Sequence, residues 1–137
     1  MPERLCVTTV MRCEMRNITA DLDHLLATTG VRRGWEDGLL VVTSPHTTCG
    51  VTINEGWDPD VCRDMTAYLS LLVPEGWDFH HAEGNSDAHI KTSLFGASAL
   101  VPVAGGRLAL GQWQAVYLCE SDGPRLRTLE VRFLRAE

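Results

Sequence analysis

The chain has 137 residues, of which 45% are hydrophobic and 22% charged, and its formal net charge is −6. These values are typical of one globular domain, here residues 1–137, and leave too few residues for two ordinary domains. No apolar run reaches the roughly 18 residues that span a bilayer, the start MPERLCVTTV lacks the order of a signal peptide, and the acidic charge disfavours nucleic acid. We therefore expect a cytoplasmic protein with neither a membrane nor a nucleic acid as partner.

The first part of the chain predicts a strand, a helix and a buried strand. Residues 5–10, LCVTTV, are rich in β-branched side chains, which favour a strand. In residues 17–30, NITADLDHLLATTG, apolar side chains recur at helical spacing, Asn17 or Thr19 provides a cap, and Gly30 ends the helix. The apolar run GLLVVTS, residues 38–44, then predicts a buried strand.

Residues 46–54, HTTCGVTIN, predict a strand that His46 opens and in which the side chains alternate between two faces. One face carries His46, Thr48, Thr52 and Asn54, and the largely apolar other face carries Thr47, Cys49, Val51 and Ile53. Residues 58–74 predict a helix, because Asp58 is a suitable N-cap and Pro59 suits the first helical position. Its predicted buried stripe consists of Val61, Met65, Tyr68, Leu69 and Leu72.

A third helix and a run of strands follow. Residues 85–96, NSDAHIKTSLFG, predict a helix that Asn85 or Ser86 caps and Gly96 ends, with His89 in its first turn. Strands are predicted at 98–103 and 107–111, joined by a hairpin turn, and at 112–120 and 127–134. About seven strands, the late ones consecutive, and about three helices indicate an α+β domain with a mainly antiparallel sheet.

Four of the five histidines are candidate metal ligands. His46 opens a predicted strand, His80 and His81 lie in a polar loop, and His89 opens a predicted helix. Imidazoles from three separate elements can converge on one zinc ion and leave a position open for water or substrate. The alternative is a set of unrelated polar residues, since the spacing from His81 to His89 is too long for a motif on one helix.

Carboxylates and one tryptophan are the remaining candidates for chemistry. Glu55 and Glu83 are each followed by glycine, so the backbone can turn and leave the carboxylate projecting into a cleft, as a general base or a group that orients a ligating imidazole. Trp113 stands between two glutamines, which suits either the sheet core or a flat heteroaromatic ligand. Glu120 ends the same strand and is expected to reach the same cleft.

Three long blocks of the sequence resemble one known family. They are HTTCGVTINEGWDPDVCRDM, HHAEGNSDAHIKTSLFG and GRLALGQWQAVYLCESDGPR, and together they cover residues 46–125 almost continuously. The sequence resembles the YjbQ family, also called the secondary thiamine-phosphate synthase family. The resemblance implies an α+β fold, a homotrimer, and a divalent metal held by clustered histidines near the subunit boundary. The activity it implies is a secondary one, in which a thiazole phosphate displaces pyrophosphate from a hydroxymethylpyrimidine diphosphate.

The resemblance also implies roles for individual residues. Its histidine positions fall on His46, on either His80 or His81, and on His89. Its acidic, polar and aromatic positions fall on Glu55, Glu83, Asn85, Trp113, Gln114 and Glu120. The chain departs from the family pattern at Thr48 and Cys49, at Gln112, and at the Gly56-Trp57 pair, all near the expected cleft.

These features lead to one expectation and two alternatives. We expect a metal-binding transferase of the thiamine-phosphate synthase type that acts on a small-molecule substrate. Three neutral imidazoles suit zinc, whereas diphosphate chemistry favours magnesium, which prefers carboxylates and water. The alternatives are a zinc-dependent hydrolase of a small substrate and a non-catalytic trimer that binds a metal or a small ligand.

Overall fold

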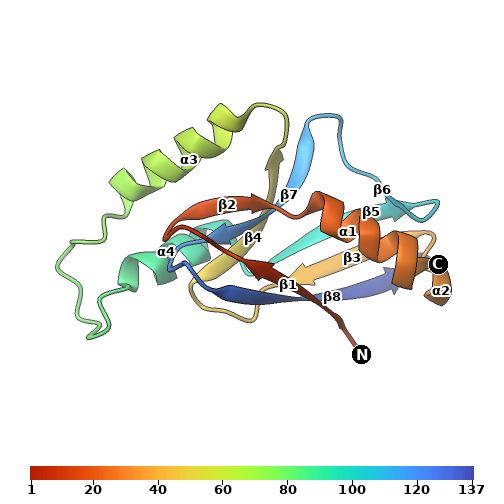
Figure 1. Ribbon diagram of the computed structural model, residues 1–137, viewed down its shortest axis with the longest axis horizontal. Helices are drawn as coiled ribbons and strands as arrows, with labels where there is room; N and C mark the ends of the chain where they lie inside the picture. Colours follow the sequence, from red (N-terminus) through yellow and green to blue (C-terminus); the bar gives the residue numbers. More distant parts are fainter.

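The computed structural model describes residues 1–137, which form two antiparallel sheets and three helices (Figure 1). The five-stranded sheet has the order β1-β8-β3-β5-β6, and its strands are β1 (Glu3–Thr8), β8 (Leu126–Arg135), β3 (Gly38–Thr43), β5 (Ser98–Ala104) and β6 (Arg107–Leu108). The three-stranded sheet has the order β2-β7-β4, and its strands are β2 (Glu14–Asn17), β7 (Gln114–Glu120) and β4 (Cys49–Glu55). The predicted antiparallel α+β fold is confirmed, although its strands form two sheets instead of one.

The main core lies between the two sheets and the first helix. Alternation places Cys49 and Val51 of β4 in this core, as the sequence predicts, together with Val116 and Leu118 of β7. The opposite face of β7 carries Ala115, Tyr117 and Cys119, which form a second, small cluster with Met15, Cys62 and Phe95. The three-stranded sheet is therefore apolar on both faces, and its outer face needs the helices on that side.

Strand β2 is the element that the sequence does not predict. Its four residues read EMRN, so three of them are charged or polar and no alternation of apolar residues marks it. It forms because it pairs with β7, with Glu14 opposite Glu120 and Asn17 opposite Tyr117. Pairing with a buried neighbour thus overrides a weak local preference.

The first helix continues past its predicted end at Gly30. It runs as α1 (Thr19–Leu25), a π-helical turn η1 (Leu26–Gly30) and α2 (Val31–Arg33). Gly34 ends it in the left-handed conformation, with φ of 65°. Gly30 is instead buried inside the helix, where a Cβ atom would lie 3.3 Å from the Leu26 side chain.

Helix α3 (Pro59–Leu72) begins as predicted but buries less than predicted. The Asp58 side chain accepts a hydrogen bond of 2.9 Å from the Asp60 N–H, and Pro59 is the first helical residue. None of its residues is buried, and Tyr68 and Leu72 are 66% and 59% exposed. The predicted buried stripe is wrong for a single chain, because α3 projects from the sheets and packs on the outer face of the three-stranded sheet mainly through its first part, including Cys62 (Figure 1).

Helix α4 (Ser86–Phe95) packs tightly on β4. Gly96 ends it with φ of 97°, and the Gly96 carbonyl accepts a hydrogen bond of 3.0 Å from the Val51 N–H. A Cβ atom on Gly50 would lie 2.7 Å from the same carbonyl oxygen, so only glycine permits this approach. The contact fixes α4 against the three-stranded sheet.

Two connections differ in how well the sequence predicts them. The hairpin between β5 and β6 turns at Gly105 and Gly106, whose φ angles of 57° and 73° suit the predicted turn. By contrast, His46 does not open β4, because residues 44–48 connect the two sheets and β4 begins at Cys49.

None of the helices has both the length and the apolar character needed to cross a membrane.

Candidate functional site

Polar side chains from distant parts of the sequence meet where β7 ends, around the carboxylate of Glu120. This carboxylate is buried and accepts hydrogen bonds from the Thr9 hydroxyl, at 2.7 Å, and from Arg127 Nε, at 2.9 Å. Burial raises the pKa of Glu120, but the hydrogen bonds from Arg127 and Thr9 outweigh it and hold the pKa below its usual value. Glu120 is therefore held in a buried ion pair with Arg127, and its carboxylate does not project into an open cleft.

His46 lies against the same buried ion pair. Arg127 Nη2 donates a hydrogen bond of 2.9 Å to the Thr48 hydroxyl, two residues beyond His46. His46 Nε2 lies 3.1 Å from the Thr128 nitrogen and 3.2 Å from the Thr128 oxygen. Burial and the nearby Arg127 lower the pKa of His46, which favours a neutral ring. Nε2 either accepts a hydrogen bond from the Thr128 N–H, which places the proton of the neutral ring on Nδ1, or donates to the Thr128 carbonyl. Only the second arrangement leaves Nδ1 free to bind a metal ion or to accept a proton.

The amino-terminal half of α4 carries a second buried ion-pair cluster, which the sequence does not reveal. Asp87 is fully buried and receives Arg12 Nη1 at 2.9 Å, Arg12 Nη2 at 3.0 Å and Lys91 Nζ at 3.1 Å. Burial raises the pKa of Asp87, but Arg12 and Lys91 outweigh it and hold the pKa below its usual value. The spacing of Asp87 and Lys91 on a helix is visible in the sequence, whereas the partner on the other side, Arg12, is 75 residues away.

Two of the candidate ligands lie together beside this cluster. The His81 and His89 rings have their centroids 5.6 Å apart and an interplanar angle of 80°. His81 Nε2 is also 3.7 Å from the Glu83 carboxylate. His80 is exposed in the same loop. Between the two adjacent histidines, the contact with His89 favours His81 as the functional one.

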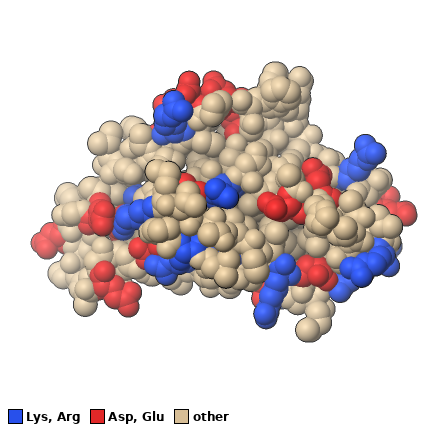
Figure 2. Space-filling view, in the orientation of Figure 1, with Lys and Arg blue, Asp and Glu red and all other residues tan.

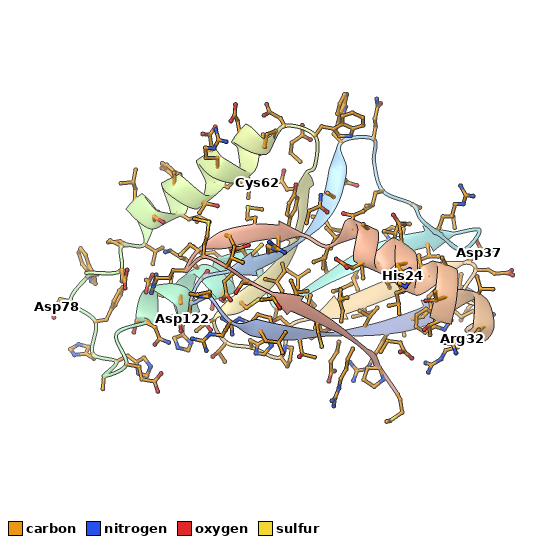
Figure 3. All side chains as sticks on the ribbon, viewed as in Figure 1. His24, Arg32, Asp37, Cys62, Asp78 and Asp122 are labelled. Carbon is orange, nitrogen blue, oxygen red and sulfur yellow. The ribbon has the colours of Figure 1, made fainter.

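Asn85 ties the start of α4 to the turn after β7. Its Nδ2 donates a hydrogen bond of 2.9 Å to Asp122, and Asp122 also pairs with Arg125 Nη2 at 3.1 Å. The Asn85 Oδ1 atom is buried without a hydrogen-bond partner, and Asn85 gives α4 no side-chain cap. Figure 3 places Asp122 beside α4, at the opposite end of the molecule from Asp37 and Arg32.

The remaining candidates lie at the other end of the β4–β7 pair. Cys49 pairs with Glu120 at one end, and Glu55 pairs with Gln114 at the other. These pairs are six residues apart, so at about 3.3 Å per residue they are separated by about 20 Å. Trp113 precedes β7, is 56% exposed, and therefore does not belong to the sheet core. Within one chain, Glu55, Trp113 and Gln114 do not join the histidines.

A single chain also does not gather a complete metal site. No three His, Cys, Asp or Glu side chains lie close enough together to hold an ion. His46 belongs to the Thr128 side of the site, and the His81–His89 pair belongs to α4. The imidazoles fit a metal by their chemistry, but one protomer supplies them in separate groups.

One cavity lies away from all these residues. It has a volume of about 750 Å³ and lies between the first helix and the β5–β6 hairpin. Its lining includes Asp23, Trp35 and Arg107 and none of the candidate site residues. None of the histidines and none of the buried ion pairs described above lines this cavity.

The chain is thus a small α+β protein with two antiparallel sheets, and its histidines His46, His81 and His89 lie at the end of the molecule that contains the buried ion pairs. Residues 3–136 match the family model described as UPF0047 protein YjbQ-like, and the chain belongs to this family. The resemblance seen in the sequence blocks is thereby confirmed.

Relatives and solved structures agree with this assignment. The chain is 42% identical to UPF0047 protein YugU of Bacillus subtilis, over 98% of this chain and 99% of that protein. It is also 42% identical to UPF0047 protein MJ1081 of Methanocaldococcus jannaschii, over 93% of this chain and 90% of that protein. A Clostridium acetobutylicum crystal structure of an uncharacterized YjbQ/UPF0047 protein has a TM-score of 0.89 at 41% identity, covering 96% of this chain and 99% of that one. The hypothetical protein APE1520 of Aeropyrum pernix K1 has a TM-score of 0.90 at 34% identity, covering 99% of each chain.

Proposed function

We propose that the protein is a metal-binding transferase of the secondary thiamine-phosphate synthase type. Its site would lie at the end of the molecule where α4 begins, which we call the α4 end, and residues of a second chain in a homotrimer would complete it. In the proposed reaction the ring nitrogen of a thiazole phosphate attacks the methylene carbon of hydroxymethylpyrimidine diphosphate. The bond from that carbon to the diphosphate oxygen breaks, and pyrophosphate leaves with the electron pair. The observation that carries the proposal is the His81–His89 pair beside the uncapped amino end of α4.

The α4 end has the groups that a diphosphate requires. The first N–H groups of a helix carry a partial positive charge and bind phosphate oxygens when no side chain caps them. Asn85 leaves them uncapped. Arg12 pairs with Asp87 in the first turn of α4, and Arg125 pairs with Asp122, which accepts a hydrogen bond from Asn85; their side chains are 30% and 51% exposed. Donors that are already fixed in place stabilise the negative charge that develops on the leaving pyrophosphate. The buried ion pairs of Asp87 and Glu120 would hold these donors in position.

The metal fits the donor chemistry but requires more than one chain. His46, His81 and His89 would hold a divalent ion, and the lowered pKa of His46 favours the neutral ring that a metal needs. The ion would supply neutralisation of the diphosphate charge. Because one chain keeps the imidazoles in separate groups, we place the site at a boundary between protomers.

Exposed apolar side chains support assembly into an oligomer. On α3, Tyr68, Leu71 and Leu72 are 66%, 78% and 59% exposed. On the five-stranded sheet, Leu100 and Leu134 are 57% and 55% exposed. Several large apolar side chains exposed on one element, as on α3, are typical of a surface that contacts another protein.

The reaction is tested by incubating the purified protein with both substrates and magnesium or zinc, and by measuring thiamine phosphate as its fluorescent oxidation product. We expect His89→Ala to abolish product formation. His24→Ala is the matched control, because His24 is an exposed histidine on the first helix, far from α4, and this variant should retain full activity (Figure 3). Product no higher in the wild-type protein than in His89→Ala would refute the transferase proposal.

Metal content and assembly are measured on the same samples by elemental analysis and native mass spectrometry. We expect a trimer that carries bound metal. A metal-bearing trimer that forms no product would support the alternative of a non-catalytic metal-binding protein. A monomer would contradict the placement of the site between protomers.

A further inference from the structure

The end of the β4–β7 pair opposite the histidines presents two tryptophans that pack together on the surface. The Trp57 and Trp113 rings have their centroids 5.6 Å apart and an interplanar angle of 74°, so their planes form a corner. Trp57 is 69% exposed and Trp113 is 56% exposed. We call this pair the tryptophan corner.

Hydrogen bonds hold the tryptophan corner in place although it is exposed. Trp57 Nε1 donates to the Gln112 carbonyl at 2.8 Å, and the Gly56 N–H donates to the Trp113 carbonyl at 2.8 Å. A Cβ atom on Gly56 would lie 2.6 Å from the Ala115 Cβ, so the two segments are in direct backbone contact. The two exposed indoles are therefore held at a fixed position relative to each other and to the backbone.

The charge around the tryptophan corner indicates what it binds. Residues 54–64, NEGWDPDVCRD, contain four carboxylates and one guanidinium, a net charge of −3. Arg63 pairs with Asp60 at 2.8 Å, and the Asp58 side chain caps α3, which leaves Glu55 and Asp64 without such partners. Figure 2 shows acidic side chains gathered at the top of the molecule, where α3 begins.

No cation of the chain itself occupies the tryptophan corner. The one contact between a cationic side chain and an aromatic ring is that of Arg33 with Trp35, at 5.8 Å and on a different part of the molecule. Indole faces attract cations more strongly than the other aromatic side chains do, and surrounding carboxylates add to the attraction. The tryptophan corner therefore offers two exposed indoles, one of which belongs to an acidic segment, to a cation from outside.

We propose that the tryptophan corner is a binding site for a small organic cation with a quaternary nitrogen. Such a cation is compact, carries apolar methyl or methylene groups against the indole faces, and keeps its charge at every pH. A flat apolar partner would gain nothing from the carboxylates, and an anion would be repelled by them. The site is about 20 Å from the histidine end within the chain, and its binding does not depend on the proposed transferase reaction.

The test compares choline with 3,3-dimethyl-1-butanol, which has the same shape but no charge, by calorimetric titration of the full-length protein. We expect choline to bind about fivefold more tightly than its neutral counterpart, and less tightly as salt is added. Trp57→Ala should remove the preference for choline. Trp77→Ala is the matched control, because Trp77 is 66% exposed on the loop after α3, and this variant should bind as the wild-type protein does.

Three results would overturn the proposal. Equal binding of choline and the neutral compound would show an apolar patch without selectivity for charge. Equal loss of binding in Trp57→Ala and Trp77→Ala would show a nonspecific effect. Dissociation of an oligomer by Trp57→Ala, seen by sedimentation, would show that the tryptophan corner is a contact between protomers. Thermal unfolding of each variant confirms that it remains folded.

Discussion

The two ends of the β4–β7 pair differ in where they keep their charge. At the Cys49–Glu120 end, which we call the ion-pair end, the carboxylates of Glu120 and Asp87 are buried in ion pairs with Arg127 and Arg12. His46, His81 and His89 lie at this end. At the Glu55–Gln114 end, two indoles are exposed, Asp58 and Asp60 are exposed, and Glu55 is half-buried. Buried pairs fix neighbouring groups in position, which suits chemistry on an anionic substrate. Exposed aromatic and acidic groups suit reversible binding of a cation.

The largest effect is expected from Asp87→Ala at the ion-pair end. This change leaves Lys91, only 4% exposed, without its carboxylate and should lower the free energy of unfolding by about 3 kcal/mol. Urea unfolding at pH 7 measures the change. Asp23→Ala, at an exposed position of α1, is the control and should change stability by less than about 0.5 kcal/mol. Equal effects of the two substitutions would mean that the Asp87 cluster contributes no stability.

A smaller effect is expected from Gly50→Ala. This substitution changes no charge, so it tests the packing of β4 on α4 independently of the ion pairs. The added Cβ would lie 2.7 Å from the Gly96 oxygen and 3.0 Å from the Phe95 Cβ, so the strand and helix must move apart at a cost of about 1–3 kcal/mol. Gly76→Ala is the matched control, because nothing lies within 4 Å of the added atom. Thermal unfolding should lower the melting temperature of the first variant alone. Unchanged stability of Gly50→Ala would mean that α4 is not held closely on β4.

The buried carboxylates of the ion-pair end should also make the free energy of unfolding depend on pH. The pKa values of Asp87 and Glu120 are lower in the folded chain than in the unfolded chain, so their contribution is fully present above the unfolded values, near pH 4. This contribution is lost as the pH falls through the folded values. The gap in unfolding free energy between the wild-type protein and Asp87→Asn should therefore be larger at pH 7 than at pH 3. A gap that does not change with pH would contradict the lowered pKa of Asp87.

The smallest expected effect concerns His46. Its pKa should lie below the usual value because of burial and Arg127, so its ring should stay neutral at a pH where an exposed histidine is partly charged. Titration of the ring protons by nuclear magnetic resonance measures this. Titration of His46 above the usual value of a free histidine would mean that its ring does not lie against Thr128 and Arg127 as described.

Local sequence signals predict much of the fold. Asp58 and Pro59 mark the start of α3, two glycines mark the β5–β6 turn, and alternation assigns the apolar face of β4, because each depends on neighbouring residues alone. The short β2 forms only through its pairing with β7, so its own residues do not reveal it. The exposure of α3 likewise depends on how much of the sheet lies beneath it.

The site was less accessible to sequence reasoning because it is built from long-range contacts. Arg12 meets Asp87 across 75 residues, and no local pattern indicates that pairing. In the sequence, Glu120 has the position of a free carboxylate at the end of a strand, and only the fold shows that it is paired with Arg127. Glu55 and Trp113 resemble site residues by type, yet the register of β4 and β7 places them about 20 Å from Glu120.

The central claim is that the imidazoles of the ion-pair end bind a metal that one chain alone does not hold. The most direct measurement is the metal content of the assembled protein after reconstitution with zinc and removal of unbound ion, for the wild-type protein, His89→Ala and His24→Ala. The account predicts about one tightly held divalent ion per chain in the wild-type protein and in His24→Ala, and none in His89→Ala. No retained metal in the wild-type protein, or the same content in all three, would contradict it.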